Sequence, residues 1–112
     1  GIAYTFYPAG SYPTSVENSS NQIVVNDYKL YQNYPNPFNP STTISFSIPK
    51  AGQTKILVFD MLGKEVAILM NDHLDAGVHT TLFEGKGLSS GIYIYRIESG
   101  SFVKAKQMIL LK

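Results

Sequence analysis

"TTISFSIPKAGQTKILVFD", residues 42–60, decides the fold class. In its first half, Ile44, Phe46 and Ile48 alternate with serine and threonine, and the run ends at a proline. A period of two is typical of a half-buried β-strand. Residues 54–60 are more continuously apolar and β-branched, which predicts a central strand. The turn residues "AGQ" lie between the two strands.

The rest of the chain repeats short apolar runs separated by turn signals. Four more strands are predicted, at residues 65–70, 78–85, 92–98 and 101–111. Gly63 suits the reversal before the first of these, because glycine adopts positive φ at low cost. Residues 71–77 and 86–91 are predicted to be loops, and no segment shows a convincing helical period. About seven strands of this kind predict an all-β, immunoglobulin-like antiparallel β-sandwich.

Tyr93 stands near the start of the penultimate strand, in "LSSGIYIY", residues 88–95. A tyrosine at this place in immunoglobulin-like sandwiches often hydrogen-bonds back to the preceding corner. We expect the Tyr93 ring in the core and its hydroxyl on the backbone of residues 86–90.

"YPNPFNP", residues 34–40, precedes the first long strand. Its prolines fix φ and lack backbone donors, so the stretch cannot form a helix or a central strand. We expect a stiff, near-extended edge segment. Tyr34 and Phe38 would anchor it to the core, and Asn36 and Asn39 would bond local backbone. A ligand loop for proline-reading partners is the less favoured alternative.

The composition excludes several function classes. A net charge of +1 gives no electrostatic case for nucleic acid or an anionic membrane. The chain has no cysteine, hence no disulfide or thiolate chemistry, and no apolar run as long as a membrane span. Residues 1–27 are polar after a short aromatic run. They are predicted to be a linker, and the aromatic run could be the end of an upstream domain.

The search for catalytic and metal sites gives no strong candidate. No serine or threonine stands in a recognisable nucleophile pattern. A metal site could be drawn from four residues, but their spacing matches no compact motif and turn formation explains them better: Asp72, His73, Asp75 and His79. We therefore expect no enzyme activity, no cofactor and no metal.

Two other features have open interpretations. Tyrosines and Phe6 near the N-terminus could form a sugar-binding platform, although core packing explains them better: Tyr4, Tyr7, Tyr12, Tyr28, Tyr31 and Tyr34. Lys104 and Lys106 fall on one face of the last predicted strand. They could guard an exposed edge against aggregation or form part of a recognition strand.

Several of these segments occur in an order that resembles one family. The set begins with Pro35-Asn36-Pro37, continues with residues 60–66 around Gly63 and then "GIY" from Gly91 to Tyr93, and ends with the lysine-bearing strand. Residues 28–112 resemble the type A C-terminal sorting domain of the type IX secretion system of Bacteroidetes. The fold of that family is an immunoglobulin-like sandwich, in agreement with the strand count.

The resemblance implies a sorting signal for a covalently fused N-terminal cargo. The cargo would pass through the periplasm to the cell surface or the medium. The implied partners are the outer-membrane translocon, its shuttle proteins and a sortase-like peptidase, which would cut within residues 14–27. By family position, the residues expected to be read by the translocon are Gly91, Tyr93, Lys104, Lys106 and Lys112. The residues expected to serve the fold are Pro35, Asn36, Pro37 and Gly63. Gly91 is also expected to serve the fold more than recognition.

Two other functions remain alternatives. One is a carbohydrate- or surface-binding sandwich attached to a secreted enzyme, and the other is a structural spacer. The sequence also leaves open a weak homodimer formed through an edge strand.

Overall fold

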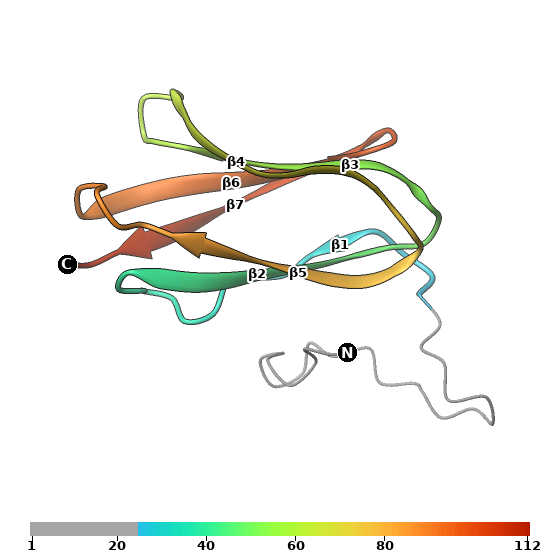
Figure 1. The fold of residues 1–112 in the computed structure, drawn as a ribbon, viewed down its shortest axis with the longest axis horizontal. Helices are drawn as coiled ribbons and strands as arrows, with labels where there is room; N and C mark the ends of the chain where they lie inside the picture. Colours follow the sequence, from blue (N-terminus) through green and yellow to red (C-terminus); the bar gives the residue numbers. More distant parts are fainter. Residues whose placement is uncertain (1–24) are drawn as a thin grey trace.

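The computed structural model describes residues 25–112, which form seven β-strands and no helix. The strands are β1 (Lys29–Leu30), β2 (Ser41–Ile48), β3 (Gly52–Phe59), β4 (Glu65–Leu74), β5 (Gly77–Glu84), β6 (Gly91–Ser99) and β7 (Phe102–Leu110). They make a three-stranded sheet in the order β1-β2-β5 and a four-stranded sheet in the order β4-β3-β6-β7. Figure 1 shows the sheets as two stacked layers. In this part of the chain no helix is long and apolar enough to span a membrane.

The topology confirms the immunoglobulin-like sandwich predicted from the sequence. All strand pairs are antiparallel, and β3 lies between β4 and β6, as expected for a central strand. The fourth strand pairs with the third instead of joining the sheet of β1, β2 and β5. This differs from the constant-type immunoglobulin arrangement, in which the fourth strand belongs to the sheet of the first, second and fifth.

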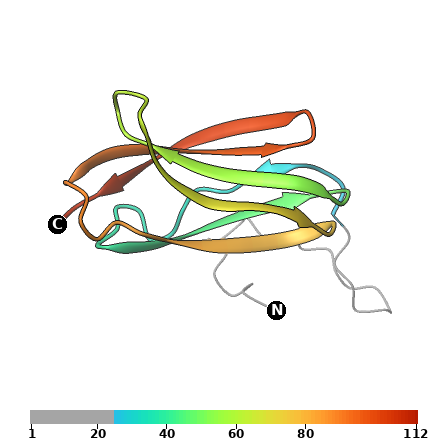
Figure 2. The ribbon, with the colours of Figure 1, turned by 45° about the horizontal axis from the view of Figure 1, so that its top comes forward.

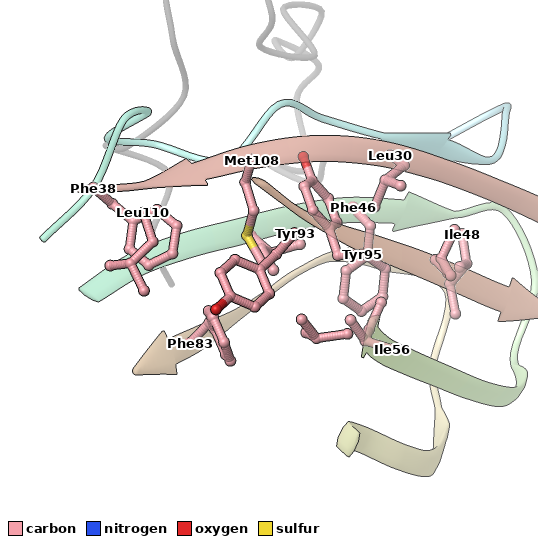
Figure 3. Packing of buried hydrophobic residues seen from close by; sticks show 13 residues of the cluster. Leu30, Phe38, Phe46, Ile48, Ile56, Phe83, Tyr93, Tyr95, Met108 and Leu110 are labelled. Carbon is pink, nitrogen blue, oxygen red and sulfur yellow. The ribbon is translucent and has the colours of Figure 1, made fainter. Parts of the chain in front are cut away.

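Alternate residues of both sheets fill a single core. Thirteen apolar side chains form the buried cluster, and ten are labelled in Figure 3: Leu30, Phe38, Phe46, Ile48, Ile56, Phe83, Tyr93, Tyr95, Met108 and Leu110. Ile44, Phe46 and Ile48 of β2 are all fully buried, as their period of two predicts. Burial of aliphatic and aromatic side chains of this size contributes roughly 1.5–3 kcal/mol each before entropy is counted.

The predicted loop at residues 71–77 is wrong except at residues 75 and 76, because β5 already begins at Gly77. Residues 71–74 continue β4, where Asn71 pairs with Lys55 and Leu74 pairs with Gly52. Residues 71–73 are exposed, and β4 is the edge strand of its sheet. Because an edge strand needs only backbone pairing with one neighbour, polar side chains can project into solvent without ending it.

β2 is more deeply buried than a half-buried strand. Ser45 and Ser47, predicted to face solvent, are only 6% and 3% exposed. β2 is the middle strand of its sheet, and the Ser47 hydroxyl donates to the Asp27 carbonyl at 3.2 Å. The chain that leads into β1 therefore lies against this side of the strand.

Candidate recognition site

Residues 34–40 form a closed loop and not the near-extended segment predicted. Tyr34 and Thr43 exchange both backbone hydrogen bonds, at 3.0 and 2.9 Å, and the residues between them bend. Phe38 is buried as expected, and its ring meets Phe83 edge-on at 5.9 Å between centroids. Tyr34 is 59% exposed, so it is not an anchor. Because the prolines fix φ and carry no N–H, their positions cannot donate to a strand ladder.

The loop is fastened from inside by Asn33, which is 2% exposed. The side-chain nitrogen of Asn33, Nδ2, donates to the Pro35 carbonyl at 3.1 Å and to the Thr42 hydroxyl at 3.0 Å. The Thr42 hydroxyl donates in turn to the Pro35 carbonyl at 2.8 Å. These bonds satisfy buried polar groups that would otherwise destabilise the fold.

The loop also holds the C-terminal end of β7. The Phe38 N–H donates to the Ile109 carbonyl at 2.9 Å, and the Leu111 N–H donates to the Phe38 carbonyl at 3.0 Å. The Asn36 side-chain oxygen accepts from the Ile109 N–H at 3.0 Å. The prediction that Asn36 bonds local backbone is therefore wrong, because its partner lies 73 residues away. The loop acts as a short strand substitute on the β7 edge.

Tyr93 forms the predicted corner. Its hydroxyl donates to the Ser89 carbonyl at 2.7 Å, and its ring is 7% exposed. Tyr95, two residues on and on the same face, was not singled out from the sequence. It is fully buried, and its hydroxyl joins the two sheets by donating to the Tyr31 carbonyl at 2.7 Å. The period of two in "GIYIYRIES" places Tyr95 in the core beside Tyr93, but its partners are set only by the tertiary fold.

The residues predicted for recognition fall into two groups along β6 and β7. Gly91, at the start of β6, pairs with Leu110 at the end of β7, and Tyr93 pairs with Met108. Lys112 follows that end of β7, and its backbone N–H donates to the Ser90 hydroxyl at 2.9 Å. Lys104 and Lys106 lie between the opposite end of β7 and its middle. The two lysines share the inner face of the strand with Met108 and Leu110, which are buried in the core.

Lys104 and Lys106 line a groove of about 240 Å³ between the edges of the two sheets. Across the groove lies β1, the short edge strand of the other sheet. The lining residues are Tyr28, Lys29, Leu30, Tyr31, Phe102, Lys104 and Lys106. Figures 1 and 2 show β1 on the same side of the sandwich as β7. Sequence reasoning found the two lysines but not the groove, because a strand as short as β1 has no periodic signal.

The residues that line the groove combine positive charge with a pair of stacked aromatic rings. The Tyr28 and Phe102 rings stack with centroids 4.9 Å apart. Lysines come from both edges, and no acidic residue is among the lining residues. Within residues 25–112 the only ion pair joins Arg96 and Glu98, at 2.7 Å. The three groove lysines therefore leave a local positive field.

The alternative sites receive little support from the described residues. Within residues 25–112, no three His, Asp or Glu side chains gather to hold a metal ion. The His79 Nε2 lies 2.7 Å from the Asp75 carbonyl, and the His79 ring stacks on Phe46 at 5.6 Å. Of the proposed aromatic platform, Tyr28 and Tyr31 line the groove while Tyr34 belongs to the proline loop. The remaining members lie outside the described residues: Tyr4, Phe6, Tyr7 and Tyr12.

A sandwich whose terminal strand is locked at one end and accessible at the other fits a recognition domain. Residues 32–111 match the family model of the secretion system C-terminal sorting domain. The chain belongs to this family, and the resemblance found in the sequence is confirmed. It is thus a sorting signal of the type IX secretion system, which exports its cargo across the outer membrane to the surface or the medium. No curated protein matches the chain.

Proposed function

We propose that residues 28–112 are a non-catalytic sorting signal read along β7 by the outer-membrane translocon and its shuttle proteins. The observation that supports this is the state of β7: its C-terminal half is held by the proline loop, whereas Lys104 and Lys106 border an accessible groove. A signal that must be recognised when folded needs a fixed surface, because a pre-organised surface loses less entropy on binding.

The proposal continues upstream of the domain. Residues 1–27 link a fused cargo to the sandwich, and the cargo passes through the periplasm before export. A sortase-like peptidase then cuts within residues 14–27, since a peptidase needs an extended and accessible backbone. Mass spectrometry of the surface-bound cargo tests this step. Cargo that still carries residues 28–112 would contradict removal.

The test of recognition is charge reversal in the whole chain. A periplasmic reporter is fused in front of residues 1–112 and expressed in a bacterium that has the secretion system. We expect the unaltered fusion at the cell surface and the K104E/K106E variant in the periplasm. The matched control is K50E/K86E, which makes the same charge change at exposed turn residues away from the groove and should be exported. Lys112→Glu tests the end of the strand separately.

Point variants are preferable to deletion of residues 103–112. That deletion would remove Met108 and Leu110, both fully buried, and would unfold the domain. Thermal unfolding of each purified chain confirms that the fold persists. Normal export of both K104E/K106E and Lys112→Glu would show that these lysines are not read.

A further inference from the structure

The outer edge of β7 has two different halves. The Ile109 N–H and carbonyl bond the proline loop and not β6. The Gln107 carbonyl accepts from the Gln32 side chain at 2.8 Å, on the same side. In an antiparallel pair, residues alternate between bonding the partner strand and pointing away from it. The β6–β7 register is unbroken from Gly91–Leu110 to Ser99–Phe102, so Val103 and Ala105 also point their backbone groups outward.

Among residues 25–112, no backbone partner covers these two residues, so the N-terminal half of the edge is open. Val103 and Ala105 each contribute one N–H and one C=O to it. Val103 is 59% exposed, and Ala105 is also exposed. An open row of backbone groups is a template for one more strand. Its length, Phe102 to Lys106, suits a partner segment of about four to six residues.

The side chains at this edge specify what such a strand would carry. Side chains of an added strand would lie beside Lys104 and Lys106 on one face and beside Val103 and Ala105 on the other. Lys29 reaches the same groove from β1. A complementary strand therefore alternates acidic residues, which face the groove, with apolar residues, which cover Val103.

We propose that the β1–β7 groove binds an extended acidic segment of a partner protein, added to the sheet as a strand along Val103–Ala105. The inference rests on the proposed function only for the biological setting, since the partner would belong to the export machinery. Lysines on the inner face of an edge strand repel basic segments, and apolar segments are disfavoured because they would desolvate the ammonium groups without pairing them. Edge protection and selective binding therefore have the same origin. Specificity would come from the alternation and affinity from backbone pairing.

The probe is a dye-labelled hexapeptide of alternating valine and glutamate, titrated into the full 112-residue chain and followed by fluorescence anisotropy. We expect saturable binding that weakens as salt is raised, because exposed charges are screened. Amide hydrogen exchange at Val103 and Ala105 should slow on binding, while exchange at Ile109 should not change. A lysine–valine hexapeptide and a valine–glutamate peptide with the charges in one block should bind at least about tenfold more weakly.

Two variants separate the backbone contribution from the charges. Ala105→Pro removes an outward N–H that β6 does not use, and proline is tolerated at such edge positions. We expect it to weaken peptide binding at least about tenfold, and K104E/K106E to abolish it. K50E/K86E should bind as the unaltered chain does. A peptide that is N-methylated at alternate residues should also fail to bind.

Equal binding by Ala105→Pro or by the N-methylated peptide would overturn the strand pairing. Equal binding by K104E/K106E would overturn the charge complementarity. Sedimentation of the same samples tests whether a second copy of the chain occupies the groove: a dimer that the peptide does not dissociate would overturn the proposal.

The outcomes of this binding test are distinct from those of the sorting test. If K104E/K106E is not exported but still binds the peptide, the proposed function is supported and this inference is wrong. If the peptide binds as predicted but all variants are exported normally, this inference is supported and the proposed function is wrong.

Discussion

The Tyr95 hydroxyl accepts a hydrogen bond from the Asn33 backbone N–H at 2.8 Å, within the core. It also donates to the Tyr31 carbonyl, so one side chain of β6 fixes the segment that leads from β1 into the proline loop. Asn33 in turn fastens that loop through Pro35 and Thr42. The loop then holds the end of β7. A single hydroxyl therefore connects the core to β7, the strand for which we propose a role in recognition.

Removal of this hydroxyl should destabilise the domain. In Tyr95→Phe the Asn33 N–H loses its buried partner, and an unsatisfied buried group costs about 1–3 kcal/mol. We expect the free energy of unfolding, measured by urea denaturation, to fall by that amount.

Tyr93→Phe is the matched control for this prediction. It removes one bond to the Ser89 carbonyl in a part-buried position and should cost less. An equal or smaller loss in Tyr95→Phe would show that the cross-sheet contact contributes little.

The same residue predicts a loss of stability at alkaline pH. Burial raises the pKa of Tyr95 above its ordinary value near 10, while the bond from Asn33 opposes this rise to a lesser degree. Above pH 10 the unfolded chain releases this proton and the folded chain retains it, so the unfolded state gains stability as pH rises. The stability that Tyr95 contributes is fully present below about pH 10 and falls as pH rises further, by at most about 2 kcal/mol at pH 11.5.

Urea denaturation at pH 9 and pH 11.5 checks this. The difference in unfolding free energy between the unaltered chain and Tyr95→Phe should narrow as pH rises, because the variant has no hydroxyl at this position to ionise. A difference that stays constant would mean that Tyr95 titrates alike in both states.

Phe38→Ala tests whether the loop holds β7. Phe38 is 2% exposed, and truncation of a buried phenylalanine costs about 3–5 kcal/mol. The loop should then release β7, so amide exchange at Ile109 and Leu111 should quicken more than exchange in β3. Asn36→Ala should quicken exchange at Ile109 with a much smaller loss of stability, because Asn36 is exposed and bonds only that amide. If amide exchange quickens equally throughout the domain in both variants, the loop does not stabilise the end of β7 specifically.

Local patterns in the sequence predict the long strands and fail where distant segments decide the structure. The alternation of Ile44, Phe46 and Ile48 identifies β2 because burial on one face imposes it. Residues 71–73 lack that pattern because they lie in an edge strand with exposed side chains, where pairing with β3 continues the strand without burial on one face. Pairings of this kind depend on strand register, which a polar segment does not encode.

The candidate site shows the same division. The period of two places Lys104 and Lys106 on one face, and a known corner motif locates Tyr93. The groove needs β1, which is two residues long, and the loop contact needs Asn36 and Ile109, which are 73 residues apart. No spacing in the sequence reports such a contact. The sequence thus predicts the candidate recognition strand but not the groove beside it.

Gly63 allows the role of the fold to be separated from recognition. Its φ is +86°, in the turn where the Gly63 N–H donates to the Asp60 carbonyl at 3.0 Å. An Asp60 side-chain oxygen accepts from the N–H groups of Leu62 and Lys64, so the turn is tightly defined. A Cβ at position 63 would meet no atom within 4 Å, which leaves backbone conformation as the only cost of a side chain there.

Gly63→Ala should therefore lower the unfolding free energy by about 1 kcal/mol, and Gly63→Asn by less, since asparagine tolerates positive φ. Both variants should bind the valine–glutamate hexapeptide as the unaltered chain does, because the turn is not among the residues that line the groove. Weakened binding by a folded Gly63→Ala chain would show that this turn belongs to the recognition surface.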